Sequence, residues 1–104
     1  MKRVIVHKRF SEFFSSLKNM DDKSKIARAI DRLKIGASCN TKPLVDGIFE
    51  LKVTGANVTY RVLFIYDRGD IVVLLSGFIK KSQKTPKSEI ALAKRLKEEY
   101  YAEK

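Results

Sequence analysis

The chain has 104 residues, and its 22 Lys and Arg against 12 Asp and Glu give a formal net charge of +10 at pH 7. This length suits one domain, and a hydrophobic fraction of 44% supplies one core. No apolar run approaches the roughly 20 residues that span a bilayer, and the first apolar stretch is too short for a signal peptide. We therefore expect one domain over residues 1–104, located in the cytoplasm. Because so basic a domain attracts phosphate, nucleic acid or an acidic protein is the expected partner.

Cysteine and histidine use argues against metal or disulfide chemistry. Cys39 is the single cysteine, so no internal disulfide can form. His7 is the single histidine, and no cluster of Cys and His offers a structural metal site. We expect no metal or other cofactor, a structural or surface role for His7 and an incidental one for Cys39.

The first third of the chain predicts a strand followed by two helices. The β-branched run at residues 4–6 is typical of a strand. Apolar side chains then recur at helical spacing, namely Phe10, Phe13, Phe14 and Leu17 in one helix and Ile26, Ile30 and Leu33 in the next. Residues 19–22 supply N-cap candidates for the second helix, and Gly36 is placed to end it. A short turn between them predicts an antiparallel helical hairpin.

The remainder predicts three strands and a last helix. The expected strands are 48–53, 58–66 and 71–79, joined by short Gly-bearing turns that favour an antiparallel meander. After a basic loop at 80–84, Thr85 is the expected N-cap and Pro86 the first residue of a helix. The predicted order is β-α-α-β-β-β-α. We therefore expect an α+β fold, with an antiparallel sheet packed on an N-terminal helical hairpin and a C-terminal helix.

Simple hairpins with four-residue loops sort the strands into two faces. They place Glu50 opposite Arg61 and Lys52 opposite Thr59. The face expected under the helical hairpin holds Phe49, Leu51, Val53, Val58, Tyr60, Val62, Phe64, Val73 and Leu75. The second face has a polar end of Glu50, Lys52, Thr59, Arg61, Ser76 and Phe78, and an apolar end of Leu63, Ile65, Val72 and Leu74. We expect the last helix to cover the apolar end and the polar end to stay open.

The polar end, with the basic loop beside it, is the candidate site. It gathers the cations Lys52, Arg61, Lys80, Lys81 and Lys84. Cations beside an aromatic side chain, here Phe78, suit a phosphodiester with a base stacked nearby. In the alternative interpretation, Glu50 and Arg61 form a cross-strand ion pair and the loop lysines are solvated. Spacing alone favours this alternative.

Three segments carry a family resemblance. They are DGIFELKV at 46–53, YRV at 60–62 and GFIKKSQKTP at 77–86. Over residues 44 to about 100, the chain resembles the phage-derived addiction-module killer proteins, which are HigB-type toxins of the RelE/ParE superfamily. The resemblance implies a RelE-like fold and a toxin that cuts mRNA on the translating ribosome. It also implies a cognate antitoxin, HigA-like and carrying a helix-turn-helix domain.

The resemblance also implies roles for individual residues. In the family's metal-independent reaction, a ribose 2′-OH attacks its own 3′-phosphate, which requires a base, cations and an acid. By position, Lys52 matches the candidate base, Arg61 the arginine that stabilises the transition state and Lys81 a basic residue after the last strand. The residues implied in RNA binding are Lys80, Lys84, Phe78 and Lys87. The chain departs from RelE in carrying Glu50 where a basic residue can stand, and in lacking a tyrosine near the position of Lys87.

Two other functions stay open. ParE-like proteins share the resemblance but block DNA gyrase by binding it, without catalysis. A gyrase binder has no need of cations that converge on the sheet, and this chain is expected to have them. A basic nucleic-acid-binding module without activity ranks last.

Overall fold

The computed structural model describes residues 1–104 as five strands and three helices. In chain order they are β1 (Arg3–Val6), α1 (Lys8–Ser16), α2 (Met20–Ile35), β2 (Thr41–Val45), β3 (Ile48–Thr54), β4 (Thr59–Asp67), β5 (Ile71–Ile79) and α3 (Lys87–Ala102). The α+β class is confirmed. None of the three helices is both long enough and apolar enough to cross a membrane.

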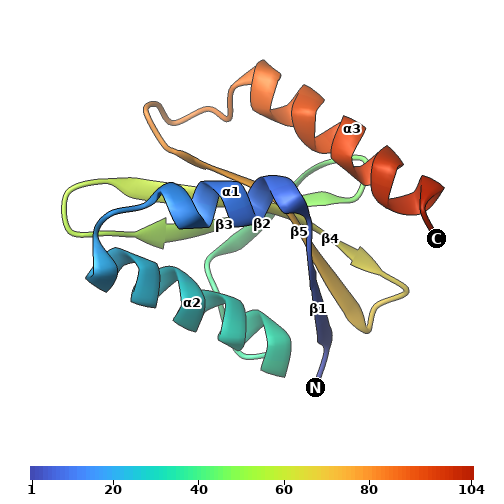
Figure 1. Ribbon diagram of the computed structural model, residues 1–104, viewed down its shortest axis with the longest axis horizontal. Helices are drawn as coiled ribbons and strands as arrows, with labels where there is room; N and C mark the ends of the chain where they lie inside the picture. The colour runs from blue at the N-terminus through green and yellow to red at the C-terminus, as the bar shows by residue number, and fades with distance from the viewer.

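The five strands form one mixed sheet in the order β1-β5-β4-β3-β2 (Figure 1). β1 runs parallel to β5, with Arg3 beside Ile71 and Val6 beside Leu74. The expectation of a wholly antiparallel sheet is therefore wrong at this edge. Because two helices separate β1 from the other strands in the chain, no hairpin turn fixes its direction.

The sequence prediction missed β2, which pairs antiparallel with β3 at the opposite edge of the sheet. The register shifts between Pro43 and Val45, and four of the five residues of β2 are exposed. Proline is tolerated in edge strands because the side away from the sheet needs no N–H donor. A short exposed edge strand has no buried face, so it lacks the alternation by which a strand is recognised.

The ends of α2 follow the predicted capping chemistry. The Asn19 side chain accepts a hydrogen bond of 3.0 Å from the Asp22 N–H. Gly36 ends the helix with φ of 76°, in the left-handed conformation that glycine adopts without strain. α1 is capped by His7, whose Nδ1 accepts from the Arg9 N–H at 3.0 Å. The single histidine therefore has a structural role.

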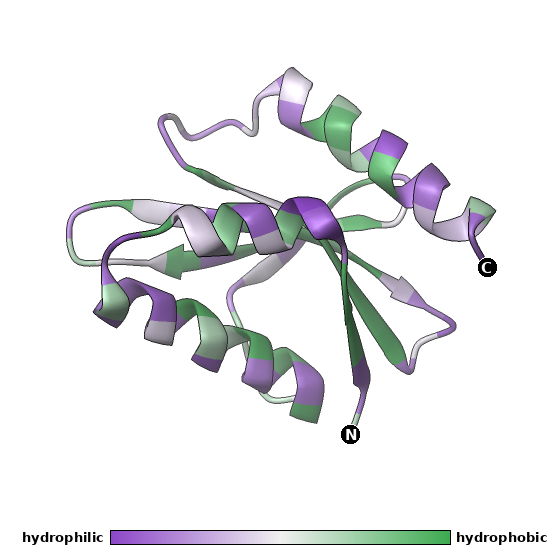
Figure 2. Cartoon of the chain, viewed as in Figure 1, coloured by the Kyte–Doolittle hydropathy of each residue, from purple (hydrophilic) through white to green (hydrophobic).

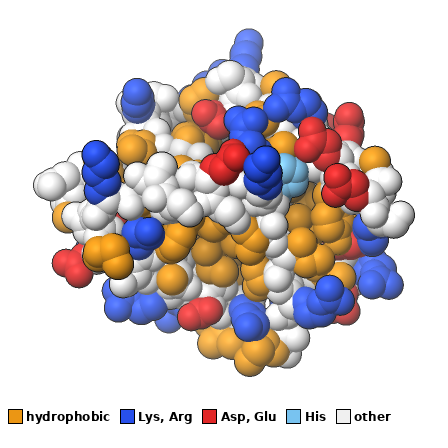
Figure 3. Space-filling model, viewed as in Figure 1, with side chains coloured by type: hydrophobic (Ala, Val, Ile, Leu, Met, Phe, Trp, Pro, Cys, Tyr) orange, Lys and Arg blue, Asp and Glu red, His pale blue; other side chains and the backbone are white.

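Two hydrophobic cores lie on the two faces of the sheet, as expected. α1 and α2 cover one face, where the buried residues are Phe10, Ile26, Leu33, Leu51, Val53, Tyr60, Val62, Phe64, Val72 and Leu74. α3 covers the other face over Ile48, Leu63, Ile65, Ile71, Val73, Leu75, Ala93 and Leu96. Figure 2 shows the apolar central strands between these polar-surfaced helices. Apolar side chains also remain visible between α1 and α2, with lysines and arginines around them (Figure 3).

The expected registers are wrong in detail. Lys52 lies opposite Arg61 and Thr54 opposite Thr59, which is two residues from the expectation. Because a strand alternates with period two, this shift leaves the faces of β3 and β4 unchanged. Between β4 and β5 the register breaks by one residue after Leu63, which leaves Leu75 as the extra residue of a bulge. The bulge reverses the faces of the residues before it, so Val72 and Leu74, and not Val73 and Leu75, lie under α1 and α2.

Candidate functional site

A small polar pocket, here called the cationic pocket, opens on the α3 face of the sheet. Its volume is about 220 Å³ and its lining residues are Asn40, Lys42, Glu50, Lys52, Arg61, Lys80 and Gln83. They come from the segment before β2, three neighbouring strands and the loop after β5. Four cations and one carboxylate thus line a pocket without any apolar residue. Such a pocket can bind an anion such as phosphate.

Strand pairing places the central side chains of this pocket. Lys52 on β3 and Arg61 on β4 are cross-strand partners, and Arg61 in turn lies opposite Phe78 on β5. The Lys80 N–H donates to the Thr59 carbonyl at 2.7 Å, which continues the β4–β5 ladder beyond the last strand residue. Lys80 is therefore held at the edge of the pocket by backbone geometry, whereas the lysines after it belong to a loop.

Arg61 sits at the centre of a buried hydrogen-bond network. Its NH1 donates to Glu50 Oε2 at 3.0 Å and to Thr85 Oγ1 at 2.9 Å, and its NH2 donates to the Gln83 carbonyl at 2.9 Å. Thr85 Oγ1 also donates to Glu50 Oε2, at 2.6 Å. Arg61 is only 3% exposed and Glu50 2%. The alternative expectation of a Glu50–Arg61 ion pair is therefore confirmed.

The same network corrects two expectations. The polar end of the sheet is not open at Glu50 and Arg61, because the segment that carries Gln83 and Thr85 folds over them. Thr85 does not cap α3 either: the helix begins at Lys87 after Pro86, with no side-chain capping bond. The Thr85 hydroxyl instead bonds the buried pair, where an unpartnered carboxylate would cost more than an uncapped helix end.

Two polar atoms of the network remain without a hydrogen-bond partner. Arg61 Nε is buried and unpartnered. Glu50 Oε1 accepts no hydrogen bond either, because both bonds to this carboxylate go to Oε2. Glu50 lines the cationic pocket, and Oε1 is the oxygen of its carboxylate that is left without a hydrogen bond. Its one charged contact is Lys42 Nζ, at 3.8 Å.

Lys80 is the lysine that these surroundings perturb. Desolvation by burial lowers its pKa below the ordinary 10.5, and the nearby charges of Lys52, Arg61 and Lys42 lower it further, while Glu50 acts in the opposite direction. Burial and the neighbouring cations therefore make the Lys80 ammonium a stronger acid than a solvated lysine. The sequence interpretation placed Lys80 among the residues that bind RNA, next to Lys81, whose role it could share.

The structure separates the predicted site residues into groups. Lys52, Arg61 and Lys80 meet in the cationic pocket. Phe78 and Lys81 line a neighbouring pocket of about 450 Å³, whose other walls come from α1 and the start of α3. Lys84 and Lys87 are exposed and line neither pocket.

Sequence reasoning missed Asn40 and Lys42 as lining residues. Both belong to the β2 region, and β2 itself was not recognised. A basic residue between two predicted elements is ordinary in a chain this rich in lysine, so the sequence offered no usable signal for either residue.

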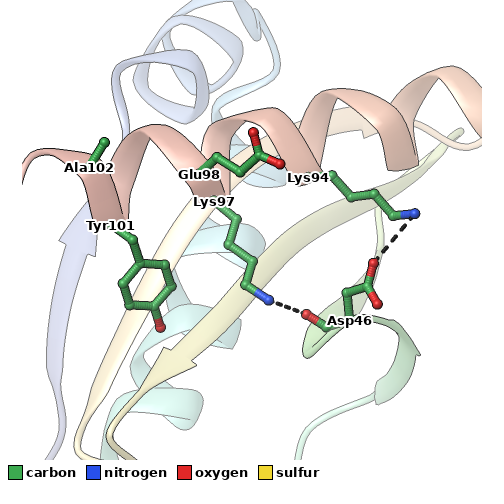
Figure 4. Close-up of a pocket in the computed structure, with 6 residues that line it drawn as sticks. All are labelled: Asp46, Lys94, Lys97, Glu98, Tyr101 and Ala102. Carbon is green, nitrogen blue, oxygen red and sulfur yellow. Dashed lines mark hydrogen bonds and ion pairs between the residues drawn. The ribbon is translucent and has the colours of Figure 1, made fainter.

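A larger depression of about 720 Å³ lies elsewhere, between the C-terminal half of α3 and the turn before β3 (Figure 4). There, Lys94 Nζ lies 3.4 Å from Asp46 Oδ2, and Lys97 Nζ donates to the Asp46 carbonyl. Its lysines are thus engaged by the turn, and it shares no residue with the cationic pocket. We interpret the contacts across this depression as the ones that hold α3 against the turn between β2 and β3.

The fold and the pocket together define a small, strongly basic α+β protein with a pocket on its sheet that is lined by cations. A model of the family described as phage-derived Gp49-like proteins (DUF891) matches residues 12–98, and the chain belongs to this family. It is a RelE/ParE-like toxin family associated with toxin–antitoxin systems, so the expected superfamily is confirmed. An uncharacterized protein of Haemophilus influenzae is 39% identical over 74 residues, which cover 71% of this chain and 74% of the relative.

Proposed function

We propose that this protein is the toxin of a type II toxin–antitoxin system, of the HigB type, and that it cleaves mRNA on the translating ribosome. A cognate antitoxin, with a helix-turn-helix domain, holds it inactive. The observation that carries the proposal is the cationic pocket, in which basic side chains from three strands and a loop converge and no lining residue is apolar. The family's association with toxin–antitoxin systems supports it.

The pocket suits the charge changes of RNA cleavage by an internal 2′-OH. In that reaction the phosphate gains negative charge in the transition state, and preorganised cations stabilise it most where water is excluded. Lys52 and Lys80 line the pocket without an ion-pair partner and are free to contact the phosphate. Arg61, hydrogen-bonded to Glu50 and Thr85, lies in the same pocket. The product chemistry is a 2′,3′-cyclic phosphate and a 5′-OH.

The neighbouring pocket suits a nucleobase. Phe78 is the cross-strand partner of Arg61, so its ring stands beside the cationic pocket. Phe13, Leu17 and Ile79 add apolar surface there, and Lys81 lies among them. Base–aromatic stacking tolerates any sequence, so this arrangement supports RNA binding without fixing a base preference.

The test is to induce the chain briefly in a bacterial host and to map new RNA 5′ ends across the transcriptome. We expect cuts within translated frames, and we expect Lys52→Ala and Lys80→Ala to lose them. Lys8→Ala is the matched control, because it removes an exposed lysine that lines neither the cationic pocket nor the pocket beside it. Lys81→Ala tests the position implied by the resemblance.

Growth arrest without new RNA ends would contradict the proposal. It would favour the ParE-like alternative, in which the buried Arg61–Glu50 pair is structural and the toxin binds gyrase. Induction of the DNA-damage response before translation stops would then identify the target.

A further inference from the structure

Glu50 is the only acidic residue that lines the cationic pocket, and its two oxygens have different surroundings. Oε2 accepts from Arg61 NH1 at 3.0 Å and from Thr85 Oγ1 at 2.6 Å. Oε1 accepts no hydrogen bond, lies 3.8 Å from Lys42 Nζ, and belongs to a residue that lines the pocket. Two donors thus hold the carboxylate through Oε2, and Oε1 is left to accept a hydrogen bond from a ligand in the pocket.

A ribose with its 3′-phosphate matches this arrangement. The phosphate needs cations, and Lys52 and Lys80 line the pocket beside Glu50. The neighbouring 2′-OH needs a hydrogen-bond acceptor, and lysine and arginine side chains offer none. Glu50 Oε1 is the one charged acceptor in the lining.

We infer that Glu50 is a catalytic residue, the general base that takes the proton from the 2′-OH of the bound ribonucleotide. This inference rests on the proposed function. It differs from the role implied by resemblance, in which Lys52 is the base, and it gives an active role to a residue that otherwise only neutralises Arg61.

In the proposed step, Glu50 Oε1 takes the 2′-OH proton while the 2′-oxygen forms a bond to phosphorus, and the bond from phosphorus to the 5′-oxygen breaks. The Lys80 ammonium gives its proton to that leaving oxygen. The products are a 2′,3′-cyclic phosphate and a 5′-OH, and the two side chains recover their charges by exchanging protons with water.

Glu50 is better placed for this role than the lysines around it. The charged groups that face it are Lys42 from β2, Lys52 on its own strand, Arg61 from β4 and Lys80 after β5, together with the Thr85 hydroxyl. All four charged groups are cations, so Glu50 is the one charged side chain in the lining that can accept a hydrogen bond from a bound hydroxyl. A lysine must first lose its own proton before it can act as a base.

Glu50→Gln is the central variant, because it keeps the shape and removes the charge. We expect single-turnover cleavage of mRNA on purified translating ribosomes to fall by about 10²- to 10⁴-fold, the usual effect of losing a general base. Binding of adenosine 3′-monophosphate, followed by NMR, should tighten by about three- to tenfold, because a negative charge leaves an anion site. Slower cleavage with phosphate binding retained excludes misfolding, and the pH profile separates general-base catalysis from a structural role. Glu103→Gln, an exposed carboxylate outside the pocket, is the control.

The pH profile of the wild-type protein tests the inference without any variant. A carboxylate base leaves the cleavage rate nearly level from about pH 6 to 8, whereas a lysine base makes it rise about tenfold per unit. A rising profile, or a Glu50→Gln protein that cuts as fast as wild type, would overturn the assignment of Glu50 alone. A wild-type protein that cuts no RNA overturns the proposed function, and the inference with it.

Discussion

The Tyr60 hydroxyl on β4 donates a hydrogen bond of 2.6 Å to Asp22 Oδ2 in the first turn of α2, and both residues are buried. Asp22 Oδ1 also accepts from the Ala56 N–H, at 3.0 Å, in the β3–β4 turn. One carboxylate therefore joins the start of α2 to the end of the hairpin that carries Lys52 and Arg61.

This junction predicts a stability that depends on pH at both extremes. The bond from Tyr60, and then that from Ala56, lowers the pKa of Asp22 below the ordinary 3.8, so its contribution is present above that pH and is lost as pH falls through the lowered pKa. The bond to Asp22, and then burial, raises the pKa of Tyr60 from 10.0 to about 12. Its contribution is complete below pH 10 and is lost between about pH 10 and 12.

Tyr60→Phe removes the hydrogen bond from the Tyr60 hydroxyl to Asp22 and so tests this junction. We expect a lower urea midpoint at pH 7, because Asp22 loses its strongest donor, and a smaller loss of stability as pH rises above 10. Tyr101→Phe is the matched control, since Tyr101 is 42% exposed and its hydroxyl makes no hydrogen bond. If Tyr60→Phe and the wild type lost the same amount of stability above pH 10, another group would be the cause.

Gly77 on β5 has no room for a side chain. A Cβ there would lie 2.4 Å from two carbon atoms of the Phe13 ring on α1. We predict that Gly77→Ala costs about 1 to 3 kcal/mol of unfolding free energy, because the aromatic ring must move within a packed core. Urea denaturation measures the loss. In the double variant with Phe13→Leu, the penalty for the alanine should shrink; additive effects of the two changes would contradict this explanation.

Arg61→Ala should damage the fold as well as any activity. The change leaves Glu50, 2% exposed, with one donor in place of two and no buried counter-charge. Removing one member of a buried ion pair costs about 3 to 5 kcal/mol, so we expect a large fall in the urea midpoint. Arg61→Ala combined with Glu50→Ala should recover part of the loss. A single variant as stable as the wild type would mean that water reaches the cluster.

The end of α3 depends on Asp67 at the end of β4. This buried carboxylate accepts from the Tyr100 hydroxyl at 2.7 Å and from Lys104 Nζ at 2.6 Å. We expect Asp67→Asn to speed amide hydrogen exchange in the last turns of α3 and to leave β3 and β4 protected, because the bonds that fasten the helix end are weakened. The exposed Asp31→Asn should change neither. Uniform loss of protection would show that α3 and the sheet unfold as one unit.

Much of the fold follows from local patterns in the sequence. The three helices and the strands β1, β3, β4 and β5 lie within one or two residues of the expected bounds, because periodicity, capping residues and Gly-bearing turns act over a few residues. The two-faced sheet with helices on both sides also follows, since apolar stripes on the helices and strands must be buried together.

The candidate site was only partly predictable. The polar end of the sheet brought Lys52, Arg61 and Glu50 to one face, as expected. Their burial was not predictable, because it depends on how the loop after β5 folds back to place Gln83 and Thr85 on the guanidinium. Lys42 lies in the same pocket on β2, a strand that lacks the alternating apolar pattern by which strands are predicted.

The sequence by itself determined every element except β2, the basic charge and the family pattern, because each depends on residue type and short-range spacing. The tertiary structure alone decided the parallel placement of β1, the bulge at Leu75 and the buried network of Arg61. It also decided which oxygen of Glu50 accepts both hydrogen bonds. These features arise between residues far apart in the chain, where packing and the cost of an unpaired buried charge outweigh local preference.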